Sequence, residues 1–117
     1  MNSLMQTKQR IEHDAAHWPL YLMEFVDDFR RERKPTMLAE PFVLTDERVD
    51  AILASTAETL CDEQGLEPPM WLTAVPACTD PWFVADMESL KAIALAESPL
   101  RFRLRKIFVL ENFLARA

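Results

Sequence analysis

Residues 45–65, TDERVDAILASTAETLCDEQG, decide the fold, because they contain a whole helix with a signal at each end. Thr45 is a good N-cap residue, and the two acidic residues after it favour a helix start. One face of the helix predicted over 46–64 carries Val49, Ile52, Leu53, Thr56, Ala57 and Leu60. Gly65, the only glycine of the chain, follows where helices commonly end in a left-handed residue.

The residues before this helix predict two more helices and a connector. A helix over about 18–33 is indicated by apolar residues at helical spacing, namely Trp18, Leu22, Phe25 and Phe29. A weaker pattern predicts a helix over 3–16, so residues 1–17 form an N-terminal helix that is prone to fray. The connector, residues 35–44, is expected to include a short strand at 42–44. It should dock on the core through Met37, Leu38, Phe42 and Val43.

The residues after Gly65 predict a proline-rich crossing segment and then short helices. Residues 66–83 contain four prolines and two tryptophans, which favours an extended but ordered path. A helix is expected over 87–97 with Asp86 as its N-cap, and a further one with Ser98 as its N-cap and Pro99 at its first position. The alternation of residues 100–105 also suits a strand, but the Ser-Pro start favours a helix. Residues 107–109 are expected to be extended, and 111–116 to form a last helical turn or two.

Composition indicates one mainly α-helical domain over residues 1–117, with four to six helices around the crossing segment. Half of the residues are hydrophobic, which suits a packed core. The apolar runs are too short for a transmembrane helix. Two cysteines are too few for a disulfide framework, so we expect a cytoplasmic protein with reduced thiols.

The motifs that carry chemistry are incomplete in this sequence. His13 and His17 have the i, i+4 spacing of metal ligands, but a third ligand is not apparent. Cys61 and Cys78 are expected to be small buried apolar residues. One glycine cannot build a phosphate-binding loop, and a nucleophile-elbow motif is absent. We therefore expect no enzyme activity, no cofactor and no bound metal.

Charge is distributed unevenly along the chain. The net charge is −6, so we do not expect this chain to bind nucleic acid on its own. Residues 35–100 carry twelve acidic residues and only two bases, Arg48 and Lys91, whereas residues 101–117 carry five bases and one acid. The basic strip Arg101, Arg103 and Arg105 either pairs with the acidic middle of the chain or binds a partner.

Three aromatic residues lie in or at the end of the irregular segment, namely Trp71, Trp82 and Phe83. Aromatic residues in such segments either pack in the core or anchor a partner protein. With the arginines of the basic strip, they complete the predicted set of partner-binding residues.

A series of short motifs gives residues 66–117 a family resemblance. In order these are Pro68-Pro69 with Trp71, Asp80-Pro81-Trp82-Phe83, Ala96-Glu97-Ser98-Pro99, Phe102-Arg103, Ile107-Phe108-Val109, Asn112-Phe113-Leu114 and Arg116-Ala117. The segment resembles the C-terminal part of small bacterial proteins associated with toxin–antitoxin loci. Some of those carry an N-terminal helix-turn-helix beside a nucleotidyltransferase-type toxin, and the first half of this chain lacks that motif.

The resemblance implies a bacterial protein that binds a neighbouring protein rather than a catalyst. We therefore expect a non-enzymatic protein-interaction module, an antitoxin-like component of a toxin–antitoxin system whose partner would be a toxin. The alternative is a nucleic-acid-associated regulator that uses the basic C-terminal strip. Homo-oligomerisation stays open at this point.

Overall fold

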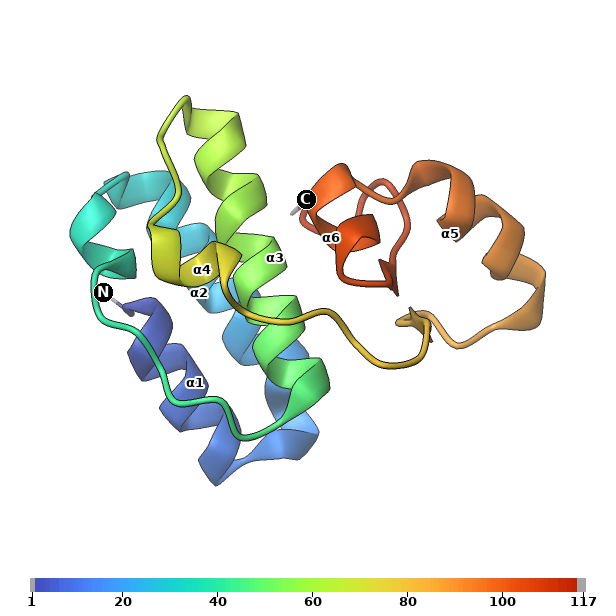
Figure 1. Ribbon diagram of the computed structural model, residues 1–117, viewed down its shortest axis with the longest axis horizontal. Helices are drawn as coiled ribbons and strands as arrows, with labels where there is room; N and C mark the ends of the chain where they lie inside the picture. The colour runs from blue at the N-terminus through green and yellow to red at the C-terminus, as the bar shows by residue number, and fades with distance from the viewer. Residues whose placement is uncertain (1, 116–117) are drawn as a thin grey trace.

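Helix α3 (Glu47–Gln64) runs through the centre of the computed structural model, which describes residues 2–115 (Figure 1). It is contacted by α1 (Leu4–His13), α2 (Trp18–Glu32), α4 (Met70–Thr73) and α6 (Leu100–Leu104). Because these neighbours cover several sides, α3 buries more than the one apolar face that the sequence indicated. Its further buried residues include Ala51, Ala54, Ser55, Glu58 and Cys61. Residues 2–115 form six α-helices and one two-stranded sheet, which confirms the mainly α-helical fold.

Asp46 and Gly65 terminate α3. The Asp46 carboxylate accepts a hydrogen bond from the Val49 N–H at 3.0 Å, so Asp46 is the N-cap and the prediction of Thr45 was wrong by one residue. Thr45 instead donates its backbone N–H to the Asp50 carboxylate at 2.9 Å. Gly65 has a φ of 67°, which confirms the predicted left-handed end.

Helices α1 and α2 pack beside α3 as an N-terminal pair. The bounds of α2 confirm the predicted helix over 18–33, and Leu22, Phe25 and Phe29 are fully buried. Helix α1 is shorter than predicted, and the 3-10 helix η1 (Ala15–His17) separates it from α2. Ser3 and Gln6 close a capping box at the start of α1, which opposes fraying of this end.

A buried ion pair joins α1 to α3. Lys8 is only 1% exposed, and its ammonium pairs with Asp50 and donates to the Val43 carbonyl. The ammonium nitrogen also lies 4.6 Å from the ring centroid of Phe42. The chain before α3 is thereby held against α1.

The connector between α2 and α3 begins with the 3-10 helix η2 (Pro35–Leu38). Met37, Leu38 and Phe42 are buried, as predicted, but Val43 is 76% exposed and does not dock. The strand predicted at 42–44 is absent from the described chain. No neighbouring strand is available there, and the buried lysine of α1 binds the backbone carbonyl that a strand would have used.

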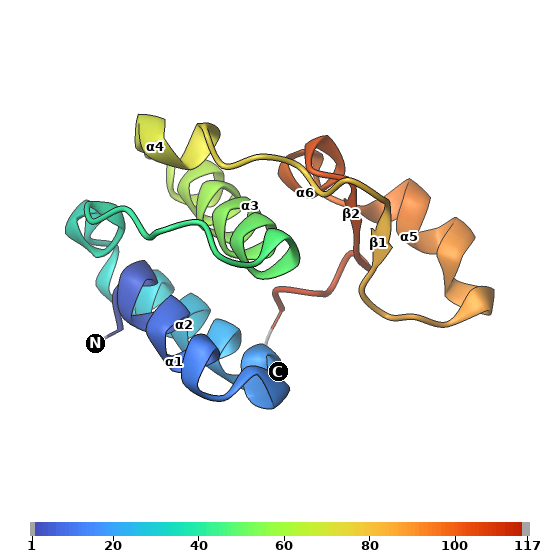
Figure 2. The same ribbon diagram turned by 60° about the horizontal axis from the view of Figure 1, so that its bottom comes forward.

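The C-terminal part is organised by a short parallel sheet (Figure 2). Strand β1 (Trp82–Phe83) ends the crossing segment that also contains α4, and it pairs with β2 (Ile107–Phe108). Between the strands lie the 3-10 helix η3 (Glu88–Leu90), helix α5 (Lys91–Glu97) and helix α6. The predicted extended segment after α6 is confirmed over the two residues of β2.

Two predicted caps in this part were wrong. Asp86 has a φ of 49° and does not cap a helix, so the helix predicted over 87–97 begins as η3. The Ser98 hydroxyl donates to the Ala94 carbonyl at 2.5 Å and accepts from the Val109 N–H at 2.8 Å, so it caps the preceding helix. Residues 111–114 form turns rather than the expected helix, and residues 116–117 lie outside the described residues.

Both parts of the chain contribute to one hydrophobic cluster, which extends in sequence from Leu4 to Leu114. Phe102 of α6 and Ile107 of β2 are fully buried in it together with the apolar side of α3. At the chain's far end, Arg30 of α2 donates to the Leu114 carbonyl at 2.6 Å. The C-terminal part is therefore packed on the helices rather than attached by a linker.

Candidate interaction surface

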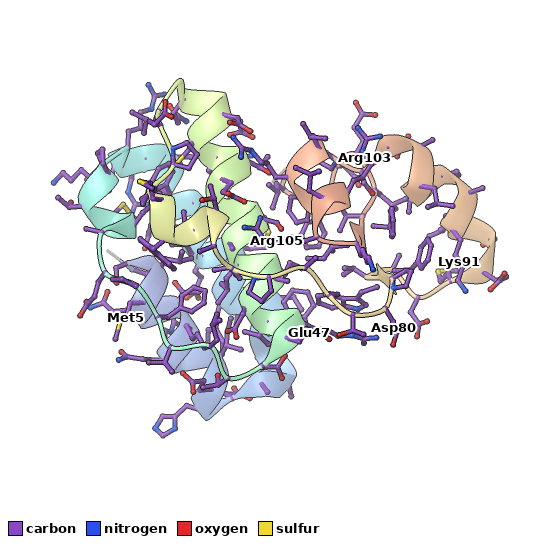
Figure 3. All side chains as sticks on the ribbon, viewed as in Figure 1. Met5, Glu47, Asp80, Lys91, Arg103 and Arg105 are labelled. Atoms are coloured by element: carbon purple, nitrogen blue, oxygen red, sulfur yellow. The ribbon has the colours of Figure 1, made fainter. Side chains whose placement is uncertain are left out.

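Arg105, one of the predicted partner-binding residues, lies inside the fold. Its guanidinium pairs with the buried carboxylate of Glu58 on α3 and donates to the Leu72 carbonyl at 2.7 Å and the Val75 carbonyl at 3.1 Å. From the end of α6 it thus binds α3, α4 and the segment after α4, and Figure 3 shows it beside α3. Arg105 is therefore a mostly buried residue that holds the fold together rather than an exposed partner contact.

Arg101 is also used within the chain. Its Nε and Nη2 atoms each lie 3.0 Å from a carboxylate oxygen of Asp62, and its Nη1 lies 3.7 Å from Glu58. The hydrogen bonds to Asp62 raise the pKa of the Arg101 guanidinium. These contacts favour the interpretation in which the basic end lies on the acidic middle of the same chain.

Arg103 is the member of the basic strip that faces solvent (Figure 3). Helical spacing places Leu100 beside both Arg103 and Leu104, and the exposed fractions of the two leucines are 60% and 63%. Phe102 points the opposite way and is fully buried, with its ring in an edge contact to Phe113. The apparent alternation of apolar and basic residues therefore resolves into one buried and one exposed helix face.

A cleft of about 380 Å³ adjoins Leu104, and its wall is the segment Val75, Pro76 and Ala77. The Glu58–Arg105 ion pair also lines the cleft. We name Leu100, Arg103 and Leu104 together with this cleft the α6 surface. The sequence-based set of partner-binding residues included the arginines of this helix but not its two leucines, although their i, i+4 spacing opposite a phenylalanine was a usable signal.

Trp71 lies apart from the other two aromatic candidates. Its indole N–H donates to the Leu38 carbonyl at 2.8 Å, and its ring makes an edge contact with Phe42 at 5.2 Å. This tryptophan holds the connector before α3 in place.

Trp82 and Phe83 of β1 are brought together at a partly open groove of about 460 Å³. The ring of Trp82 lies 5.7 Å from Trp18, and the ring of Phe83 stacks on Phe108 at 5.0 Å. Two cations complete the groove, whose members are Trp18, Arg48, Trp82, Phe83 and Lys91, hereafter the aromatic–cation groove.

The histidines of the N-terminal part do not gather metal ligands. His17 hydrogen-bonds to the Asp14 carboxylate at 2.8 Å, as does the Tyr21 hydroxyl. These two bonds lower the pKa of Asp14, the bond from His17 having the larger effect. Within residues 2–115, no three histidine, cysteine or acidic side chains are grouped so that they could hold a metal ion.

Both cysteines are buried, as predicted, and neither is in a disulfide. Burial raises the pKa of the Cys61 thiol to about 11 and also raises that of Cys78. Among the helices described, none combines the length and the hydrophobicity needed to cross a bilayer.

Comparison of the chain with protein-family models, with curated proteins and with solved structures found no match.

Proposed function

We propose that the protein is a non-enzymatic interaction module that binds a partner protein through the α6 surface. The observation that carries this proposal is the pair Leu100 and Leu104, each more than half exposed beside Arg103 and an open cleft. Adjacent large apolar side chains left in water are typical of a protein-binding patch, and arginine is enriched in such patches.

Exposed apolar residues are also concentrated in the part of the chain that contains α6, which supports a binding surface there. Among the described residues, nine large hydrophobic side chains are exposed, and five of them fall within residues 87–104. The five are Met87, Ile93, Leu95, Leu100 and Leu104. A partner that covered residues 87–104 would remove these side chains from water.

The resemblance of residues 66–117 to antitoxin-associated segments suggests the kind of partner. On this proposal the chain is an antitoxin-like component of the bacterial cytoplasm, where its two thiols would stay reduced, and its partner would be a toxin. The nucleic-acid alternative is weaker, because Arg101 and Arg105 are engaged by carboxylates of the chain itself.

The test compares two double variants that exchange exposed apolar residues for charge. Leu100→Glu with Leu104→Glu alters the α6 surface, and Val43→Glu with Leu44→Glu is the matched control, since those residues are also more than half exposed. Wild type and control should retain the same partner in affinity purification from the source cells, whereas the α6 variant should lose it.

Light scattering and absorbance at the nucleic-acid band, measured on the same samples, identify the other outcomes. A partner that both variants retain equally would remove the α6 surface from consideration. Co-purification of nucleic acid by a nuclease-sensitive contact would favour the regulator. Self-association lost only in the α6 variant would show that the surface binds a second copy of the chain.

A further inference from the structure

The aromatic–cation groove places one base against each of two consecutive aromatic residues of β1. The Arg48 guanidinium carbon lies 5.2 Å from the ring centroid of Trp82, and the Lys91 ammonium lies 5.3 Å from that of Phe83. The first base comes from the opening turn of α3 and the second from the start of α5. Two elements that are distant in sequence thus supply one cation each to the same groove.

These two bases are the only ones in residues 35–100, which also contain twelve acidic residues. Random placement would scatter two bases over so long and acidic a segment, but the fold gathers both of them at one groove. Because Asp86 also lines it, the groove holds two bases and one acid, and it is a weakly positive site on a chain whose net charge is −6.

Arg48 is free to bind an anion, because its acidic neighbours are used elsewhere. Asp46 caps the first turn of α3, and the Glu47 carboxylate accepts from the Thr79 N–H at 2.6 Å. Among the described residues, no carboxylate forms a salt bridge with Arg48. Lys91 has one partner, Glu88 at 3.0 Å, whose side chain is 89% exposed, so this pair contributes little and can exchange.

The ligand that fits these groups is a carboxylate-bearing peptide. A guanidinium beside an aromatic ring keeps its N–H donors for a carboxylate, which it can bind through two parallel hydrogen bonds. The flanking rings of Trp18 and Trp82 add apolar surface for the side chain next to that carboxylate. The groove is open enough, at about 460 Å³, for a short segment of extended chain.

A nucleic acid fits the groove less well. Phe108 stacks on Phe83, Lys91 lies over the same ring, and Arg48 lies over Trp82, so the ring faces that a base would need are already covered. Asp86 also lines the groove and repels any anion, so the carboxylates of a ligand must lie beside Arg48 and Lys91 and away from Asp86.

We propose that the aromatic–cation groove binds a short acidic segment of the partner protein, with one carboxylate on Arg48 and a second on Lys91. The inference rests on the proposed function in that the ligand is a protein, but it uses a surface different from the α6 surface. In this second contact, the partner would present glutamate or aspartate residues that flank an apolar side chain.

The three indole N–H groups provide the readout. In a nitrogen-15 correlation spectrum, the Trp18 and Trp82 signals should move as the peptide acetyl-Glu-Glu-Leu-Glu-Glu-amide is added. The Trp71 signal is the internal control, because its N–H is bonded to the Leu38 carbonyl away from the groove. The same peptide with glutamine in place of glutamate should cause much smaller shifts.

Variants of the groove then test the residues directly. Arg48→Glu with Lys91→Glu should abolish the saturable shifts, and Arg48→Gln should weaken binding several-fold without reversing a charge. Lys34→Glu is the control, since it reverses an exposed base outside both the groove and the α6 surface, and it should leave peptide binding within about twofold.

Three results would overturn the inference: no saturable shift with the acidic peptide at millimolar concentration, equal shifts with the glutamine peptide, or tighter binding of a single-stranded oligothymidylate. Inorganic phosphate serves as the probe for a simple anion site, and binding of phosphate equal to that of the peptide would also overturn it. If the groove binds no acidic peptide but partner binding still depends on Leu100 and Leu104, this inference is wrong and the proposed function is not affected.

Discussion

Asp46 is the residue on which the start of α3 depends. Its carboxylate satisfies the Val49 N–H, which has no carbonyl partner in the first turn. We expect Asp46→Ala to lower the free energy of unfolding by about 1 kcal/mol. Thr45→Ala should cost less, because the Thr45 contact to Asp50 is made by its backbone.

Urea denaturation of both variants measures these costs. The helix start assigned here would be wrong if Thr45→Ala were the more destabilising of the two. Asp46→Asn is a useful control, since asparagine can make the same capping bond and should retain most of the stability.

The Cys61 thiol provides a prediction on pH. Burial raises its pKa from 9.0 to about 11, so the folded chain keeps the thiol neutral where the unfolded chain has lost its proton. The stability contributed by this group is present below the unfolded pKa and is lost as the pH rises from 9.0 to about 11.

We therefore expect the wild type to lose more stability than Cys61→Ala over that pH range, as measured by urea unfolding at several pH values. At neutral pH the folded thiol should also react slowly with a disulfide reagent and quickly after denaturation. Rapid reaction of Cys61 in the folded chain, with Cys78 replaced by alanine, would contradict its burial.

At the scale of elements, arginines tie α6 to α3. Arg105 is buried with Glu58, and Arg101 binds Asp62 at the edge of the same contact. Removing one partner of a buried pair leaves the other charge uncompensated, so Arg105→Ala should cost about 3–5 kcal/mol. Arg101→Glu should cost on the order of 1 kcal/mol, because that pair is partly exposed.

Arg103→Glu is the control for this contact, and its effect on the urea midpoint should be within about 0.5 kcal/mol. We expect Arg105→Ala to lower the free energy of unfolding most, Arg101→Glu to lower it less, and Arg103→Glu to lower it least. Equal destabilisation by Arg101→Glu and Arg103→Glu would mean that the ion pair with Asp62 contributes nothing. Double replacement of Glu58 and Arg105 by leucine and methionine should recover part of the loss.

At the scale of the whole molecule, one hydrophobic cluster joins the N-terminal helices to the C-terminal sheet. Phe102 and Ile107 are fully buried within it, and Arg30 binds the Leu114 carbonyl from the opposite end of the chain. A shared core predicts that the two parts unfold together, in a single cooperative transition.

Two spectroscopic probes can test this. Far-UV circular dichroism reports mainly on the long helices α2 and α3, whereas fluorescence includes Trp82 in the sheet and Trp71 in the crossing segment. The two urea curves should coincide in midpoint and slope. A separate, earlier fluorescence transition that is lost in Trp82→Phe would show that the C-terminal part opens independently.

The sequence alone determined the elements whose signals are local. The bounds of α2 and the left-handed end of α3 followed from helical spacing, a proline in the first turn and a single glycine, which act within a few residues of each other. The cap of α3 was missed by one residue, because Thr45 and Asp46 are both good caps and the choice depends on backbone geometry.

Only the tertiary structure decided what the site residues do. The partners Arg105 and Glu58 are 47 positions apart, and the bases of the aromatic–cation groove come from α3 and α5. The exposure of Leu104 and of Val43 likewise depends on which distant segments pack beside them. Residue patterns carry local conformational preference, but burial and pairing arise from contacts between distant segments, which one sequence does not specify by inspection.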